Sequence, residues 1–309
     1  MNKKIIFAWA CDYTKFSGEG NLARKFIEDL RFYKNKVIVK SYLKSNRKKF
    51  GFDDKYYSPL IGIFNCWKFY LKGYSTCYVN FLPLWNVLIF FLLPPKTIFG
   101  PITGGAYYNS SIKYQYLIRK FLFPIFYKIS EIIINFRRKK FLFSTSLLKN
   151  KLSNTTIKNS IFDYAFSNLK IKKYKNKKID FVIYYRKNKN KNSFFSEHLL
   201  KKINKLGYDV HIVGDHLKLK FVKNHGFLNK HKLNKLLSKA KFTIASGENI
   251  FSFFSIDCIQ NNVIVLTDNL KNYDNIHLNH FFEKINFKNL KFKLKKLKSK
   301  KIKKNCKKN

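Results

Sequence analysis

The chain has 309 residues, of which 46% are hydrophobic and 18% aromatic, enough to bury a large core; this excludes a largely disordered protein and predicts two domains. Its 63 Lys and Arg residues against 17 Asp and Glu give a formal charge of +46, which favours anionic partners such as phosphates, nucleotides and acidic lipid surfaces. The lysines are spread along the whole chain together with many Asn, Ile, Phe and Tyr residues, which indicates a compositional bias rather than one basic stripe selected for nucleic acid.

The cysteines and the apolar runs exclude several further classes of protein. The five cysteines are odd in number and show no CxxC or Cys/His spacing, so they predict neither a disulfide framework nor a zinc site and fit a reducing cytoplasm: Cys11, Cys66, Cys77, Cys258 and Cys306. The apolar segment before Asp12 is too short for a signal peptide, and the run 87–93 is shorter than the roughly 20 residues of a spanning helix. We therefore expect a cytoplasmic protein, with peripheral attachment to the inner membrane face kept open.

The first half of the chain reads as alternating strands and helices. A strand is predicted at 5–10, and a helix follows at 21–33, where Leu22, Phe26 and Leu30 share one face. Further strands are predicted at 36–42, 77–81, 96–100 and 140–146, the last closing this half. Strands separated by longer connections indicate right-handed crossovers and a parallel sheet.

The same pattern restarts after the basic, apolar-poor stretch 170–178, which suits a linker. Strands are then predicted at 179–185, 208–214, 241–245 and 263–267, and helices at 233–240 and 251–260. The resulting architecture is α/β with an N-terminal domain at 1–168, a C-terminal domain at 169–290 and a basic tail at 291–309. The tail is either a final helix or a frayed end.

One segment of the first half, residues 114–140, combines large apolar side chains with Lys and Arg. This composition is typical of a helix, or a helix pair, that lies at an anionic membrane surface. A core helix of the first domain with basic flanks would have the same composition, so both interpretations stay open.

Two glycine-rich turns follow strands of the first half. Gly18 and Gly20 lie in "SGEG", between a strand and a helix, and Gly104 and Gly105 lie in "GPITGG" after the strand at 96–100. Such turns let backbone amides approach a ligand at the carboxyl ends of parallel strands. Each is also what an ordinary tight turn looks like, and the missing third glycine of the first argues against a dinucleotide fingerprint.

Charged residues of the second half lie where a phosphorylated ligand is expected. Arg186 directly follows the strand 179–185, and Lys191 comes five residues later, so that a guanidinium fork and an ammonium could hold a diphosphate. The stretch 246–257, "SGENIFSFFSID", would aim its loop amides from Ser246 onward at phosphate oxygens. Its third residue, Glu248, would lie in the loop, and its last, Asp257, in an apolar helix, where a carboxylate needs a partner or a ligand to offset its burial.

Taken in order, these features resemble the GT-B glycosyltransferases of the group 1 (family 4-like) type. The resemblance covers about residues 3–285 and rests on "GEGNLA", "GPITGG", Arg186 with Lys191, "HGFLNKHKLNKLLSKAKFTIAS" and "GENIFSFFSID". It implies two Rossmann-like domains with parallel sheets that face a cleft. It also implies that the first domain holds a carbohydrate or lipid-linked acceptor and the second a nucleotide-sugar donor.

The resemblance also assigns roles to single residues. Arg186 and Lys191 would match the pair on the donor pyrophosphate, and Glu248 the carboxylate near the donor sugar; these are the candidate catalytic residues. The donor-binding candidates are Gly18 and Gly20 near the phosphates, Gly226 and Phe227 near the base, Ser246 in the loop and Asp257 on the ribose. Gly104 and Gly105 are the candidate acceptor-side loop. Catalysis of this type needs no metal or cofactor, since cationic side chains and helix-end amides stabilise the leaving group.

This sequence departs from the family pattern at three places. The second carboxylate is Asp257 rather than a glutamate and lies one residue further from Glu248 than usual, and Ser252 stands where a glycine is usual. All seven histidines lie at or after His198, so the first-domain histidine of many relatives has no match. A retaining or an inverting outcome therefore stays open.

The predicted function is transfer of a sugar from a nucleotide-sugar donor in cell-envelope polysaccharide biosynthesis. Two alternatives are a basic nucleic-acid-binding protein and a catalytically silent GT-B-fold binding subunit. The charge and the aromatic content favour the first of these, but no helix-turn-helix, RRM or zinc-finger pattern accompanies them. The altered carboxylate spacing favours the second.

Overall fold

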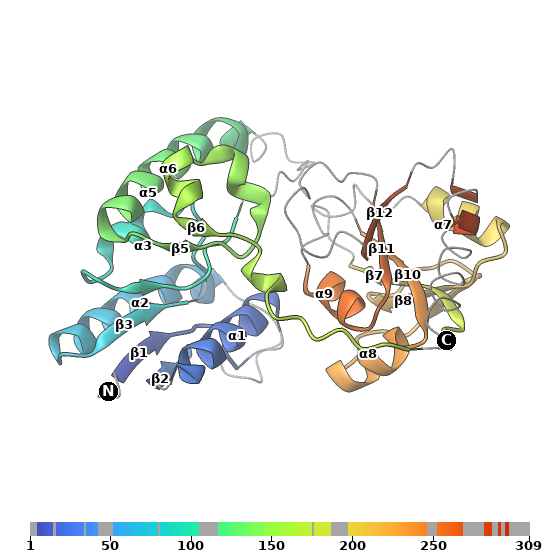
Figure 1. Cartoon of the computed structure of the whole chain (residues 1–309), viewed down its shortest axis with the longest axis horizontal. Helices are drawn as coiled ribbons and strands as arrows, with labels where there is room; N and C mark the ends of the chain where they lie inside the picture. Colours follow the sequence, from blue (N-terminus) through green and yellow to red (C-terminus); the bar gives the residue numbers. More distant parts are fainter. Residues whose placement is uncertain are drawn as a thin grey trace. The chain divides into compact units, whose positions relative to one another are not determined.

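The computed structural model describes two α/β units (Figure 1). The described residues are 5–14, 17–33, 35–42, 52–79, 81–104, 117–174, 176–186, 197–245, 252–267, 281–285, 290–291 and 294–296. Among them, the first unit ends at Ser167 and the second begins at Asn168.

The first unit is built on a parallel four-stranded sheet in the order β2-β1-β3-β4. Its strands are β1 (Ile5–Trp9), β2 (Lys36–Lys40), β3 (Ser75–Tyr78) and β4 (Ile98–Phe99). The connections are α1 (Gly18–Phe32), α2 (Phe52–Leu71) and α3 (Val87–Leu92). Because the chain moves from β1 to β2 and then back past β1 to β3, right-handed crossovers place α1 on one face of the sheet and α2 and α3 on the other. The four predicted strands of this sheet are confirmed.

The remaining part of the first unit differs from the sequence prediction. The predicted strand at 140–146 shortens to β5 (Phe141–Leu142), which pairs with β6 (Ser160–Ile161) in a separate parallel sheet. The prediction that it is the last strand of this half is wrong, because β6 follows it; Ile102 and Phe143 make an isolated bridge. The other elements here are η1 (Ile118–Leu122), α5 (Phe123–Arg137), η2 (Ser146–Lys151), α6 (Asn154–Lys158) and η3 (Tyr164–Phe166).

The second unit is built on a parallel six-stranded sheet in the order β12-β11-β10-β7-β8-β9. Its strands are β7 (Ile179–Tyr185), β8 (Val210–Gly214), β9 (Val222–Asn224), β10 (Ala240–Ile244), β11 (Ile264–Thr267) and β12 (Phe282–Lys284). Its helices are α7 (Glu197–Lys205), α8 (Lys230–Leu237) and α9 (Phe253–Gln260). The predicted strand 179–185 is confirmed residue for residue, whereas α8 begins three residues before the predicted helix and ends before Ala240, which belongs to β10.

The stretch predicted as a linker is fastened to the second unit. The Lys177 ammonium donates to the carbonyl oxygens of Ala240, Asn261 and Asn262 at 2.6, 2.9 and 2.8 Å. The backbone N–H of Lys172 donates to the carbonyl of Gln260 at 2.8 Å. Charge-assisted hydrogen bonds of this kind hold the entry to β7 against the start of β10 and the end of α9.

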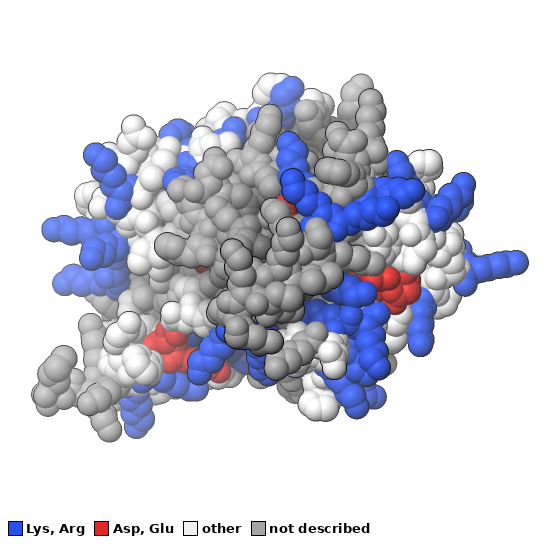
Figure 2. All heavy atoms as spheres, turned by 45° about the vertical axis from the view of Figure 1, so that its right-hand side comes forward, with Lys and Arg blue, Asp and Glu red and all other residues white. Residues whose placement is uncertain are grey.

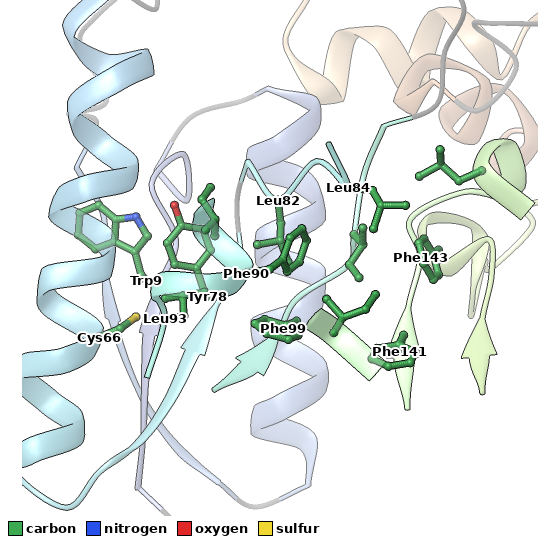
Figure 3. Packing of buried hydrophobic residues seen from close by; sticks show 14 of the residues in the cluster. Trp9, Cys66, Tyr78, Leu82, Leu84, Phe90, Leu93, Phe99, Phe141 and Phe143 are labelled. Carbon is green, nitrogen blue, oxygen red and sulfur yellow. The ribbon is translucent and has the colours of Figure 1, made fainter. Parts of the chain in front are cut away.

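Each unit has its own hydrophobic core. In the first, Trp9 and Tyr78 from the sheet meet Phe90 from α3, and the core continues through Phe99 to Phe143 beside the small sheet (Figure 3). In the second, Phe181, Ile212 and Phe242 from three neighbouring strands pack with α7. Leu290 and Leu294 are fully buried in this second core, so the chain contributes to the unit beyond the predicted start of the tail.

No helix in the described part of the chain is both long enough and apolar enough to cross a bilayer.

Close packing at Gly100 generates a test of the first core. A Cβ atom at this position would lie 2.7 Å from the Cα of Val79, a contact with backbone that cannot move aside cheaply. We expect Gly100→Ala to lower the free energy of unfolding by about 1–3 kcal/mol in urea titrations, as overpacking does. Gly73→Ala is the comparison, because its surroundings are open and only its φ of +79° opposes a side chain, at about 1 kcal/mol. If Gly100→Ala were as stable as the wild-type protein, the close contact between Gly100 and Val79 would be contradicted.

Candidate functional site

The carboxyl edge of the second sheet has a topological switch point between β7 and β10. From β7 the chain proceeds to β8 and β9 on one side, then returns to β10 on the other side of β7. The connections that follow β7 and β10 therefore leave in opposite directions, which opens the sheet edge between them. Open parallel sheets bind their ligands at such a point.

Three strand ends beside this point are tied together through the backbone. Asp215, just after β8, donates its N–H to the carbonyl of Tyr185 at 2.9 Å, and Gly214 donates to the carbonyl of Gly226 at 2.9 Å. Gly214 has a φ of +104°, and a Cβ there would lie 2.2 Å from the carbonyl oxygen of Tyr185. Only glycine fits this position, so the edge of the sheet is a rigid platform.

Arg186 stands exposed on this platform, as the first residue after β7. Its neighbour Tyr184 stacks on Phe254 in the first turn of α9, with ring centroids 5.6 Å apart. Burial raises the pKa of the Tyr184 hydroxyl; the positive charge of Arg186 opposes this shift and the negative charge of Asp215 adds to it. The ring stack thus joins the strand that carries Arg186 to the helix that carries Asp257.

Asp257 lies in α9 and pairs with a cation from the neighbouring helix. The Lys230 ammonium, in the first residue of α8, donates to the carboxylate of Asp257. A second link holds the two helices together, since the Asn261 side-chain amide donates to the Asn234 side-chain oxygen at 3.0 Å. The partner that burial of this carboxylate requires is therefore present within the unit, as Lys230.

Burial also governs the protonation of Asp257. Desolvation raises the pKa of this carboxyl, and the hydrogen bond and charge of Lys230 oppose the shift. A carboxyl whose pKa is higher in the folded than in the unfolded state stabilises the fold most below its unfolded value and loses that contribution as the pH rises through its folded value. The ionised form of Asp257 is therefore less favourable in the folded protein than in the unfolded chain.

The start of α9 is capped by its own side chains. Ser252 is the N-cap, and its hydroxyl accepts from the backbone N–H of Ser255 at 3.2 Å. The Ser252 hydroxyl thus satisfies one N-terminal donor of the helix. The predicted site residues Ser246, Glu248 and Lys191 lie outside the described residues.

Gly226 and Phe227 follow β9 at the same edge of the sheet. Gly226 has a φ of +66° with open space where a side chain would point, and the Phe227 ring is 73% exposed. An aromatic side chain this exposed beside a glycine turn is available to stack on a flat ligand. Both residues therefore lie on the edge where the sequence predicts base binding, and that role stays a prediction.

The predicted glycines that the structure describes in the first unit lie in two kinds of local structure, a helix start and a position of positive φ. Gly18 and Gly20 lie in the first turn of α1 rather than in the loop before it, and the N–H of Gly20 donates to the hydroxyl of the N-cap Ser17 at 2.9 Å. Gly104 has a φ of +115° directly after Thr103, which bridges to Pro83. Gly105 lies outside the described residues, and the roles of all four glycines remain predictions.

Two histidines lie close together in the second unit: His211 in β8 and His225 directly after β9. His211 Nδ1 and His225 Nε2 are 2.9 Å apart, and His211 Nε2 is 3.3 Å from a carboxylate oxygen of Asp209. Burial is the main cause that lowers the pKa of both imidazoles, and the charge of Lys223 lowers it further. The folded protein therefore favours neutral histidines next to Gly226.

Sequence reasoning missed Lys230, Tyr184 and Phe254. Lys230 could have been found from Asn229, a residue type that favours helix N-caps. The Asn229 side chain accepts from the Lys232 N–H and caps α8, so Lys230 is the first residue of that helix. No sequence pattern predicts the ring stack, because it depends on how β7 and α9 meet in three dimensions. Among the described residues, no group of three or more His, Cys, Asp or Glu side chains could hold a metal ion.

Positive charge extends well beyond this edge of the sheet. On the face that Figure 2 shows, Lys and Arg side chains are spread widely, whereas Asp and Glu appear only in small groups. This distribution agrees with the sequence and differs from a single basic stripe. A general field of this kind attracts polyanions without defining a site.

No protein-family model and no curated protein matches this sequence. Solved structures do match its fold. A putative UDP-N-acetylglucosamine 2-epimerase from Listeria monocytogenes aligns over 96% of this chain and 88% of its own, with a TM-score of 0.51 and 10% identity. The chain has the GT-B fold.

Two further structures align at lower TM-scores. A UDP-GlcNAc 2-epimerase from Methanocaldococcus jannaschii, in complex with UDP-GlcNAc and UDP, covers 96% of this chain and 92% of its own, with a TM-score of 0.43 and 11% identity. A glycotransferase of kitacinnamycin aligns over 94% of this chain and 88% of its own, with a TM-score of 0.42 and 10% identity. At identities this low the likeness shows the fold alone. It does not show which residues of this GT-B chain form a site.

The ion pair between α8 and α9 generates one prediction. We expect Asp257→Asn to raise the urea midpoint at neutral pH, because the amide removes a carboxylate that is costly to bury. We expect Lys230→Gln to lower the free energy of unfolding by about 1–3 kcal/mol, because it leaves that carboxylate without its cation. A loss of stability in Asp257→Asn as large as in Lys230→Gln would mean that the pair is a net stabiliser instead.

The histidine pair generates a pH-dependent prediction. Because both pKa values are lowered in the fold, the unfolded chain takes up protons first as the pH falls below about 6.5, and native stability falls with it. We expect His225→Asn to lose less stability than wild type between roughly pH 7.5 and pH 5.5, measured by urea titration at each pH. Equal losses in the two proteins would contradict the burial of a neutral pair.

Proposed function

We propose that this GT-B chain is a glycosyltransferase that moves a sugar from a nucleotide-sugar donor to a carbohydrate or lipid-linked carbohydrate acceptor. The single observation that carries the proposal is the position of Arg186, an exposed guanidinium at the carboxyl end of the strand that borders the switch point of the second sheet. A planar fork of donors at this place suits the two negative charges of a donor diphosphate. Cytoplasmic cell-envelope polysaccharide assembly, at the inner membrane face, is the proposed setting.

The donor would lie along the carboxyl edge of the second unit. Arg186 with Lys191 would neutralise the diphosphate as it leaves, which lowers the barrier most where charge develops. Phe227 beside Gly226 would stack on the base, and Glu248 would approach the transferred sugar. Asp257 would accept hydrogen bonds from ribose hydroxyls while Lys230 holds its charge, a use that explains why a carboxylate costly to the fold stands in α9.

Binding is the first test, because it separates the donor site from later chemistry. We expect UDP, UDP-GlcNAc or another nucleotide diphosphate or its sugar to raise the melting temperature of the full chain in a panel. Arg186→Ala should weaken binding of that nucleotide by about tenfold to a hundredfold, since a charged hydrogen-bonding partner is lost. Arg31→Ala, which removes an exposed arginine of α1 in the first unit, is the matched control and should bind like wild type.

Turnover then separates the competing functions. Release of UDP that depends on an added carbohydrate acceptor supports transfer, whereas conversion of UDP-GlcNAc without an acceptor supports epimerisation, the activity for which the Listeria protein is named. Binding without either reaction supports a silent GT-B subunit. The proposal is refuted if no nucleotide binds, or if affinity for nucleic acid falls steeply with salt and does not respond to nucleotide sugar.

A further inference from the structure

The first unit exposes large apolar side chains on three helical segments. Six of these side chains lie on α2, α3 and α5, and we call them the apolar face: Leu60, Phe64, Leu88, Phe91, Ile132 and Phe136. Phe136 is 93% exposed and Ile132 69%, whereas such residues normally lie inside a protein. On α5 the series continues to Ile129 and Ile125 at spacings of three and four, so these residues form one stripe along the helix.

Two side chains fasten the three helices at one place, the C-terminal end of α3. The Trp67 indole N–H on α2 donates to the carbonyl of Leu92 at 2.8 Å. The Arg137 guanidinium at the end of α5 donates to the carbonyls of Leu93 at 2.6 Å and Phe91 at 3.3 Å. These bonds satisfy carbonyls that the end of α3 would otherwise leave without partners, and they hold the stripes of α2, α3 and α5 side by side.

The charges of the same segment are almost all positive. Between residues 57 and 140 the sequence has one acidic residue, Glu131, which is buried and bonded to the hydroxyl of Ser153 at 2.6 Å. It has eleven basic residues, namely Lys68, Lys72, Lys96, Lys113, Arg119, Lys120, Lys128, Arg137, Arg138, Lys139 and Lys140. Seven of these are lysines with exposed side chains on or next to the three helices: Lys68, Lys72, Lys96, Lys120, Lys128, Lys139 and Lys140.

We propose that the apolar face docks on an anionic phospholipid bilayer. Its Phe, Leu and Ile side chains enter the boundary between headgroups and acyl chains, and the surrounding lysines contact the lipid phosphates. Exposed apolar side chains on three linked helices, with basic residues on and next to the same helices, provide both of the signals that stable attachment to a membrane surface requires. The docking surface extends the segment 114–140, noted from its composition, to α2 and α3, which the sequence pattern did not connect with it.

Charge complementarity favours a bilayer over a second copy of the chain. Two copies that paired through the apolar face would bring their lysines together with few acidic residues to oppose them, namely Asp53 and Asp54 in the sequence of α2 and the buried Glu131. Like charges at an interface disfavour association, whereas an anionic lipid surface neutralises them. The docking surface is also independent of the proposed sugar transfer, since its residues lie in a different unit from Arg186.

The test uses the full chain and vesicles of phosphatidylcholine with about one-third phosphatidylglycerol. Wild type should co-sediment with these vesicles and bind pure phosphatidylcholine vesicles far less. Its fluorescence should shift to shorter wavelength on binding, because Trp67 lies beside the apolar face; Trp67→Phe should abolish most of the shift. The nucleotide panel on the same sample reports the donor site separately, so failure of one proposal leaves the other measurable.

A charge-neutral double variant isolates the apolar contribution. Ile132→Ser with Phe136→Ser should weaken vesicle partitioning by about tenfold or more, because two inserting side chains are lost while the net charge is unchanged. Phe32→Ser removes a ring that is 83% exposed on α1 and should bind vesicles like wild type. Circular dichroism confirms that each variant is folded. Unchanged partitioning of the double variant, or wild-type self-association that the double variant abolishes in sedimentation velocity without vesicle binding, would overturn the proposal.

Discussion

Parallel pairing of β7 with β8 on one side and with β10 on the other is the constraint on which the second unit depends. It makes β7 a central strand, buried along most of its length, and it forces the chain to cross from β9 back over β7 before it can add β10. That crossing creates the switch point and places Arg186 beside it. It also explains why only glycine fits at position 214, since a Cβ there would collide with the carbonyl of the last residue of β7. The position of the candidate donor site is thus a consequence of strand order.

Long apolar runs made part of this arrangement predictable. β7 was predicted at its observed bounds because "IDFVIYY" is an apolar run, broken only by Asp180, between polar stretches, the pattern of a strand buried on both faces. β5 was predicted too long, because a run of apolar letters does not reveal how many of its residues find a partner strand. The start of α8 was missed because hydrophobic periodicity locates the middle of a helix, whereas its end depends on a cap such as Asn229. The link between Tyr184 and Phe254 depends on tertiary packing and had no signal in the sequence.

Asp257 shows how structure changes the meaning of a predicted site residue. In the sequence, a carboxylate in an apolar helix indicates a partner or a ligand, and the structure provides Lys230 as the partner. Yet burial still raises the pKa of Asp257, so its ion pair does not fully offset the loss of hydration. A partly exposed lysine is a cation that can be shared: if ribose hydroxyls bind the carboxylate, they add hydrogen bonds without displacing the charge. The ion pair and the proposed ligand are therefore compatible, and the same carboxylate could serve both.

The charge of +46 and the apolar face act at different ranges, and only together do they define how the chain would meet a membrane. A diffuse positive field attracts any anionic surface from about a Debye length away, but it orients the protein weakly, because Lys and Arg are spread along the sequence and over the face in Figure 2. Apolar side chains act only at contact, and the exposed stripes of α2, α3 and α5 are held side by side by bonds from Trp67 and Arg137. The positive field would therefore set the rate at which the chain associates with a bilayer. The apolar face would set the orientation of the first unit on that bilayer. A compositional bias in lysine alone could supply the first effect; the second requires the particular placement of Phe64, Phe91 and Phe136.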